Sequence, residues 1–145
     1  MHRVVYISSA PVPWSPEDLA DLLAVSRRNN AAAGITGMLL YHEQSFLQVL
    51  EGEEPALSAC FDRIARDPRH RNLIVMWRGA AAERIFANWQ MGFARMCDLV
   101  ADGAISLEEL FRRGLEGPGD PVVEKLVRVY LRGFPDIAGP SAARL

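Results

Sequence analysis

The sequence predicts one α+β domain with a ferredoxin-like βαββαββ sheet. Three observations indicate this fold. Segments typical of strands and helices follow one another in that order, and the strands carry apolar side chains on both faces. The 145 residues, half of them apolar, also suffice for one core without metals or disulfides. Right-handed crossovers then place two helices on one sheet face and make the first and third strands central neighbours.

The first strand and first helix are marked by clear boundary signals. Residues Arg3 to Ser9 are typical of a strand, and the prolines that follow predict a loop. Ser15 is a good N-cap with Pro16 at the first helical position, so a helix should run from here to about Arg28. Its apolar residues recur at helical spacing: Leu19, Leu22 and Leu23.

A hairpin should follow. Gly34 and Gly37 flank a strand from Ile35 to Tyr41, and the next strand runs from Phe46 to Glu51. The four residues between them predict a short reversal: His42, Glu43, Gln44 and Ser45. Alternation along these strands puts Gln48 on one face between Phe46 and Leu50.

The second half of the sheet is predicted by shorter signals. An amphipathic helix from Glu54 to Arg66 ends before Pro68. Strands should follow over Leu73 to Trp77 and Trp89 to Met96. Both sheet faces are apolar, so the face away from the first two helices needs its own cover.

Two C-terminal segments have apolar stripes that fit this cover. We expect short helices over Ser106 to Arg113 and Asp120 to Arg132, and they should pack on the second face of the sheet. The predicted organisation is therefore a core over residues 1–96, a helical cap of the same domain over 97–133, and a flexible tail over 134–145.

Composition excludes several function classes. Sixteen basic and eighteen acidic residues give a net charge of -2, which disfavours nucleic acid and anionic membranes as partners. No signal peptide or membrane-spanning stretch is evident, so a cytoplasmic location is expected. Cys60 and Cys97 lack metal-ligand spacing and should be free thiols. The histidines are too scattered for a metal site: His2, His42 and His70.

A glutamine in an otherwise apolar strand is the first functional signal. A buried Gln48 amide without partners would cost about 1 to 3 kcal/mol per unmet group. Tyr6, on the neighbouring strand, can supply a partner and is also a possible redox group. On this pattern alone, a pair that simply satisfies its own hydrogen bonds inside a core is the simpler interpretation.

Polar residues on the two predicted helices extend that signal. Leu22, Ser26 and Asn30 follow one face of the first helix, although the asparagine pair Asn29 and Asn30 also suits a helix C-cap. On the second helix, Arg63 and Asp67 stand one turn apart beside Ile64, and a solvated ion pair explains them equally simply. Together these side chains and the Tyr6/Gln48 pair describe a slot for the polar edge of a flat heteroaromatic ring, which a flavin fits.

Several ordered motifs resemble one family. They are Ser26-Arg27-Arg28-Asn29-Asn30, Gly34-Ile35-Thr36-Gly37-Met38-Leu39-Leu40, Phe46-Leu47-Gln48-Val49-Leu50-Glu51-Gly52, Asp67-Pro68-Arg69-His70 and Phe86-Ala87-Asn88-Trp89-Gln90-Met91-Gly92-Phe93. This set resembles the BLUF domain, the sensors of blue light using FAD, over roughly residues 1 to 96.

The resemblance implies a photoswitch and a non-covalently bound flavin, FAD with FMN or riboflavin as alternatives. Tyr6 would donate an electron to the excited flavin, and Gln48 would lie between the phenol and the flavin N5 and C4 carbonyl. Trp89 and Met91 match positions thought to report the state of Gln48 to the protein surface. Which of these two faces the flavin is left open.

The resemblance also implies cofactor contacts. Asn30 matches the residue that bonds the pyrimidine edge of the flavin, and Asn29 matches a more variable neighbour. The remaining matched positions are Arg63, Asp67, Arg69 and His70, of which the last two are the weaker candidates.

The sequence fits two other function classes less well than a photoreceptor. An enzyme is disfavoured because the sequence has no Gly-rich phosphate loop, HExxH motif or nucleophile set. A purely structural module would bind no flavin on reconstitution. Because no catalytic domain follows before Leu145, we expect a sensor that signals to a separate, unidentified protein or through a homo-oligomer.

Overall fold

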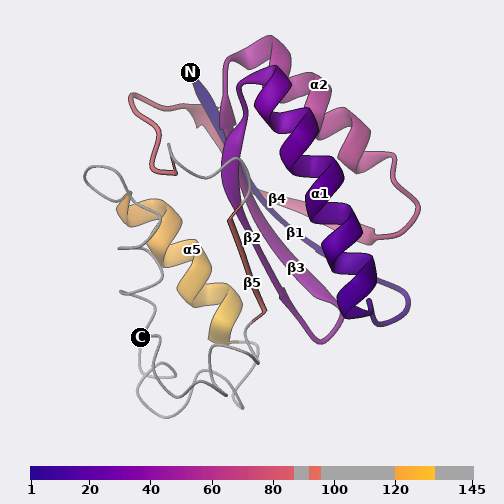
Figure 1. Cartoon of the computed structure of the whole chain (residues 1–145). Helices are drawn as coiled ribbons and strands as arrows, with labels where there is room; N and C mark the ends of the chain where they lie inside the picture. The colour runs from indigo at the N-terminus through magenta and orange to yellow at the C-terminus, as the bar shows by residue number, and fades with distance from the viewer. Residues whose placement is uncertain (87–91, 96–119, 133–145) are drawn as a thin grey trace.

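A computed structural model describes residues 1–86, 92–95 and 120–132 (Figure 1). Within these residues the elements, in chain order, are β1 (His2–Ser9), α1 (Pro16–Ala33), β2 (Thr36–His42), β3 (Ser45–Gly52), α2 (Glu54–Ala65), β4 (Arg71–Ala80), β5 (Gly92–Arg95) and α5 (Pro121–Arg132). The strand and helix order predicted from the sequence is confirmed for these elements.

The five described strands form one sheet in the order β4-β1-β3-β2-β5. β1 pairs antiparallel with β3 and β4, β2 pairs antiparallel with β3, and β5 lies parallel to β2. The predicted ferredoxin-like arrangement, with β1 and β3 as central neighbours, is therefore confirmed. Tyr6 and Gln48 are direct cross-strand partners in this register.

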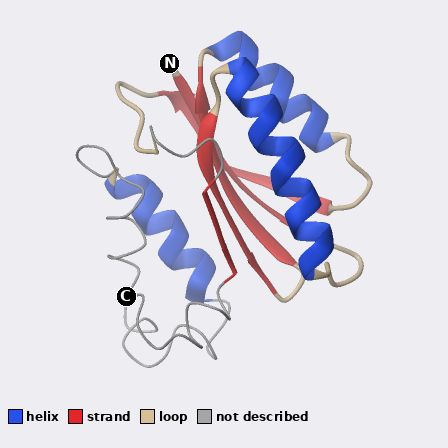
Figure 2. Cartoon of the chain, viewed as in Figure 1, coloured by secondary structure: helices blue, strands red, loops and turns tan. Residues whose placement is uncertain are grey.

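Helices α1 and α2 lie side by side on one face of the sheet, and α5 lies on the other (Figures 1 and 2). Alternation along the strands divides the apolar residues between two cores. The core under α1 and α2 contains Val4, Tyr6, Leu39, Phe46 and Leu50 from the strands, with Leu19, Leu23, Leu57, Cys60 and Phe61 from the helices. Here Cys60 is a buried free thiol.

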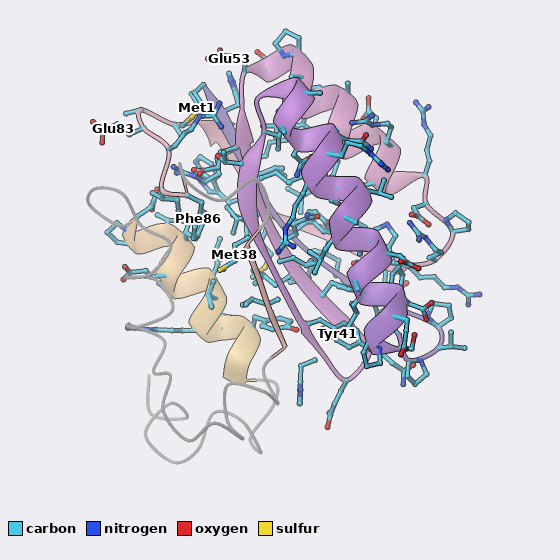
Figure 3. The ribbon with its side chains drawn as sticks, in the orientation of Figure 1. Met1, Met38, Tyr41, Glu53, Glu83 and Phe86 are labelled. Atoms are coloured by element: carbon cyan, nitrogen blue, oxygen red, sulfur yellow. The ribbon has the colours of Figure 1, made fainter. Side chains whose placement is uncertain are left out.

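The second core confirms the predicted helical cap for the part of it that the structure describes. α5 buries Val123, Val127 and Tyr130 against Val5, Met38, Leu40, Leu47, Val49, Ile85 and Phe86. Figure 3 shows Met38 and Phe86 on this side of the sheet. The helix expected over Ser106 to Arg113 and the tail expected over 134–145 lie outside the described residues, as does Cys97.

The first helix is longer than predicted. It begins as expected, with the Ser15 hydroxyl accepting from the Asp18 N–H and the Asp18 carboxylate accepting from the Ser15 N–H. It ends at Ala33 rather than near Arg28, because Gly34 (φ 70°) provides the left-handed cap and its N–H donates to the Asn30 carbonyl. Asn29 and Asn30 are therefore inside the helix, which rules out the alternative that this pair forms the C-cap.

Strand β4 is also longer than predicted, because it pairs with β1 along nearly its whole length, from His2 beside Ala80 to Ser9 beside Arg71. The predicted fifth strand is represented by Gly92–Arg95, while its earlier part lies outside the described residues. In the described part of the chain, no helix combines the length and apolar character needed to cross a lipid bilayer.

Candidate functional site

A pocket opens on the helix side of the sheet, between α1, the end of α2 and the loops beside them. It encloses about 480 Å³ of empty space, part of it open to solvent. Its wall is formed by Tyr6, Ser8, Trp14, Leu22, Ser26, Leu39, Phe46, Gln48, Ile64, Asp67, Arg69 and His70. The fold thus brings together eight of the residues singled out from the sequence: Tyr6, Leu22, Ser26, Gln48, Ile64, Asp67, Arg69 and His70.

The innermost polar group is the Tyr6/Gln48 pair. The Tyr6 hydroxyl donates a hydrogen bond to Gln48 Oε1, and both side chains are buried. Phe61 packs against Tyr6 in a T-shaped arrangement, with ring centroids 5.8 Å apart. Burial raises the pKa of Tyr6 far above its ordinary value of 10.0, and the nearby Cys60 and Asp67 act in the same direction. The phenol therefore keeps its proton, which it presents to the glutamine.

Asp67, Arg69 and Trp14 form a stacked group at the pocket. Arg69 Nη2 lies 2.6 Å from Asp67 Oδ2, and the guanidinium carbon lies 5.1 Å from the centre of the Trp14 ring. Hydrogen bonding from Arg69 lowers the pKa of the Asp67 carboxyl. The sequence suggested an ion pair between Arg63 and Asp67, but Asp67 pairs with Arg69 instead. The reason is that α2 ends at Ala65, so Asp67 lies beyond the helix that carries Arg63.

His70 is held at the pocket wall by the end of α2. Its Nε2 lies 2.5 Å from the carbonyl oxygen of Ile64. Because a carbonyl only accepts, Nε2 must carry a proton in this contact. The imidazole ring lies near the Tyr6 ring, with centroids 6.5 Å apart and an angle of 49° between the ring planes.

Sequence reasoning did not single out four lining residues: Ser8, Trp14, Leu39 and Phe46. Ser8 could have been found, because it lies two residues after Tyr6 on the same strand face. The Ser8 hydroxyl is buried and has no hydrogen-bond partner among the described residues. Trp14 follows two prolines in a loop whose path the sequence does not predict.

These groups fit a flavin ring. The wall offers an amide, a phenol, hydroxyls and an imidazole, set among aromatic and aliphatic side chains, as a flat heteroaromatic ring with one polar edge requires. The unpartnered Ser8 hydroxyl is a further polar group available to a ligand. Across the described ranges, no cluster of three potential metal ligands occurs.

Three predicted contact residues do not line the pocket as described. Asn29 and Arg63 are exposed on their helices. Asn30 is buried one turn beyond Ser26, with the Cys60 thiol 3.9 Å from its Oδ1. Burial raises the pKa of that thiol, while Arg63 opposes the rise. Trp89 and Met91 lie outside the described residues.

Comparison with known families gives an independent result for the same region. The model of the family described as "BLUF: Sensors of blue-light using FAD" matches residues 1–92, which contain every described residue of the pocket wall. The chain belongs to the BLUF family. It is therefore a flavin-binding light-sensing domain, and the matched region is a sensor rather than a catalytic domain.

The proteins that match this chain differ greatly in length. Photoactivated adenylate cyclase subunit alpha of Euglena gracilis is 33% identical over 107 residues, which are 72% of this chain and 10% of that protein. A structure of Klebsiella pneumoniae BlrP1 with FMN and cyclic diGMP matches with a TM-score of 0.78 and 30% identity, covering 91% of this chain and 35% of that one. The chain thus spans about a tenth of the length of the curated cyclase relatives that it matches.

A shorter BLUF structure has nearly the same extent. The dark-state structure of BlrB, described as a BLUF protein, matches with a TM-score of 0.68 and 28% identity. This match covers 90% of the present chain and 96% of BlrB. The likeness to BlrB extends the shared fold beyond the residues matched by the family model.

Proposed function

We propose that Tyr6 and Gln48 are the photoswitch of this BLUF domain and that it holds FAD without a covalent bond. The observation that carries this proposal is the buried hydrogen bond from the Tyr6 phenol to Gln48 Oε1 at the wall of the pocket. A neutral phenol is the form that can release an electron and a proton together, and burial keeps Tyr6 in that form.

A bound flavin would supply the absorption of blue light and, once excited, an electron acceptor. Light would then drive electron and proton transfer from Tyr6 through Gln48 to the flavin, because Gln48 Oε1 already accepts the hydrogen bond of the phenol. Gln48 can then rotate or tautomerise, because an amide presents a donor at one end and an acceptor at the other. Rapid return of the electron and proton to Tyr6 would leave the hydrogen bonds around Gln48 rearranged and the absorption shifted slightly to the red.

The pocket residues have proposed binding roles. Leu22 and Ile64 would contact the ring faces, and Ser26, Arg69, His70 and Asp67 would contact its polar groups or the cofactor tail. Asn30 would bond the pyrimidine edge from its buried position beside Cys60. Asn29 and Arg63 would contact the exposed part of the cofactor. FAD is favoured by the family description, and FMN or riboflavin remain alternatives.

The output is proposed to leave the pocket through the segment that carries Trp89 and Met91. A separate downstream protein, or another copy of this chain in a homo-oligomer, would read the change. A cytoplasmic location stays a prediction from the sequence. The cyclase relatives suggest that BLUF domains can direct enzymatic outputs, but the partner of this chain is not identified by them.

The test is the absorption spectrum of the flavin-reconstituted chain before and after blue light, in wild type, Tyr6→Phe and Gln48→Leu. We expect a reversible red shift in the wild type and its loss in both variants. Tyr130→Phe is the matched control, because Tyr130 is a buried tyrosine on the opposite face, bonded to the Ser45 carbonyl. A wild type that binds flavin without a shift would favour a flavin carrier, and no flavin binding at all would refute the assignment.

A further inference from the structure

The strands β1 and β3 carry a second cross-strand polar pair besides Tyr6/Gln48. Arg3 lies opposite Glu51, three residues along from Tyr6 opposite Gln48. An offset of three residues turns side chains to the other face and separates the pairs by about 10 Å along the strands. The photoswitch pair therefore faces α1 and α2, while Arg3/Glu51 faces the side covered by α5.

Glu51 is a fully buried carboxylate with a complete set of donors. Arg3 Nε lies 3.1 Å from Oε2, and the backbone N–H groups of Ile85 and Phe86 donate to the carboxylate at 2.9 and 2.8 Å. These bonds fix the segment that follows β4. That segment places Phe86 in the core under α5, as Figure 3 shows.

Arg3 also reaches two other parts of the chain. Its Nη1 lies 2.8 Å from Asp120 Oδ2, and its Nη2 donates to the carbonyl oxygen of Glu83 at 2.7 Å. Asp120 directly precedes α5 and caps its start, because its Oδ1 accepts the N–H of Val122 at 2.8 Å. The guanidinium therefore joins β3, the segment after β4 and the start of α5, and we call Arg3, Glu51 and Asp120 the Arg3 joint.

We propose that the Arg3 joint positions α5 on the sheet and transmits the state of the Tyr6/Gln48 pair to it. This inference rests on the proposed photoswitch. Both pairs bridge the same two strands, so a rearrangement at Gln48 that shifts β3 against β1 also changes the Arg3/Glu51 contact. Buried, directional hydrogen bonds hold one arrangement firmly, and their loss would loosen α5 and the segment after β4 together.

Asp120→Asn is the variant that isolates the contact with α5. Asparagine is as good an N-cap as aspartate, so the start of α5 is retained while the charge facing Arg3 is removed. Glu51 still compensates Arg3, so the fold should persist. Glu124→Gln is the matched control, because it removes the other acidic charge of the first turn of α5. Both changes weaken the helix dipole interaction to a similar degree.

The measurement is amide hydrogen exchange of α5 in the flavin-loaded chain, in the dark and under blue light. In the dark we expect Asp120→Asn to speed exchange of the α5 amides about fivefold, as for the loss of one partly buried ion pair. Glu124→Gln should stay close to wild type. Illumination should speed α5 exchange in the wild type and add little in Asp120→Asn, while the red shift itself is retained.

The outcomes separate the joint from the photoswitch. Equal dark exchange in Asp120→Asn and wild type, or an equal increase in Glu124→Gln, would overturn the positioning role of the joint. A wild type with a red shift but without a light effect on α5 would overturn the transmission role. Loss of the red shift in the wild type would instead overturn the photoswitch on which transmission rests, and the dark comparison would still decide the positioning role.

Discussion

At the scale of single residues, the chemistry of the pocket depends on one buried phenol. Tyr6 donates to Gln48 and lies among groups that disfavour its ionised form: a low-polarity core, the Cys60 thiol and the Asp67 carboxylate. Its raised pKa means that the proton shared with Gln48 is present throughout the neutral pH range. Hydroxide therefore does not compete with the glutamine for that proton until the medium is strongly alkaline.

This burial predicts how stability depends on alkaline pH. The unfolded Tyr6 phenol ionises near its ordinary pKa of 10.0, whereas the folded one does not. Its contribution to stability is therefore complete below pH 10 and is lost as the pH rises above it. The free energy of unfolding, measured with urea, should fall less steeply above pH 10 in Tyr6→Phe than in wild type.

Tyr130→Phe gives the comparison for this effect. Burial raises the pKa of Tyr130 to about 12, a smaller change than for Tyr6. Replacing Tyr130 should therefore flatten the alkaline decline by less than replacing Tyr6. Identical slopes for wild type and Tyr6→Phe would show that Tyr6 ionises as easily in the folded protein as in the unfolded one.

Residues on regular strands were easier to predict from sequence than residues on loops. Gln48 was conspicuous as an amide in an apolar strand, and the two-residue period predicted which residues share a face with it on its own strand. The sheet register then places Tyr6 directly opposite Gln48. The stacking of Arg69 on Trp14 was not predictable, because both residues lie on loops. That Asp67 pairs with Arg69 rather than with Arg63 was also not predictable, because this choice depends on where α2 ends.

At the scale of secondary-structure elements, the β2–β3 hairpin is closed by an unfavourable pair of residues. Glu43 (φ 46°) and Gln44 (φ 65°) both have positive φ, as in a type I′ turn. Asparagine and glycine adopt this conformation with little strain, whereas glutamate and glutamine do not. The hairpin is nevertheless tightly specified, because β2 and β3 pair from His42 beside Ser45 to Thr36 beside Glu51.

Replacing the two turn residues by Asn-Gly should therefore stabilise the chain. For Glu43→Asn combined with Gln44→Gly we expect a gain of about 1 to 2 kcal/mol in the free energy of unfolding. Urea unfolding of the flavin-loaded protein measures it, and the red shift should be unaffected. Gly34→Asn is a useful comparison, since it tests the other left-handed position and should cost under about 1 kcal/mol. A loss of stability on introducing Asn-Gly would contradict the turn assignment.

The end of α1 shows why the boundary of a helix is difficult to predict from the sequence. The pair Asn29-Asn30 suits a C-cap, yet three alanines follow and favour continued helix. Gly34 then supplies a left-handed cap that costs less than asparagine would. The choice between two plausible caps is decided by packing, since Asn30 is buried against Cys60.

At the scale of the whole molecule, the sheet separates two hydrophobic cores that have different roles. The core under α1 and α2 surrounds the pocket, and the core under α5 contains Phe86 and the apolar face of that helix. The sequence predicted both, because every central strand is apolar on both faces. It did not predict the Arg3 joint, because only the assembled sheet brings residues 3, 51 and 120 together.

The buried charge of Glu51 should make a large contribution to global stability. Glu51→Gln keeps the shape of the side chain but removes the negative charge that compensates Arg3, and it turns one acceptor into a donor facing the Ile85 and Phe86 N–H groups. Because Asp120 still contacts Arg3, we expect a loss of about 2 to 4 kcal/mol in the free energy of unfolding. Glu53→Gln, two residues away and 78% exposed, should change it by less than about 0.5 kcal/mol. Urea unfolding of both flavin-loaded variants tests this. Equal, small effects would mean that Glu51 is not an essential counter-charge, whereas a large effect confined to Glu51→Gln would establish Glu51 as the buried counter-charge of Arg3.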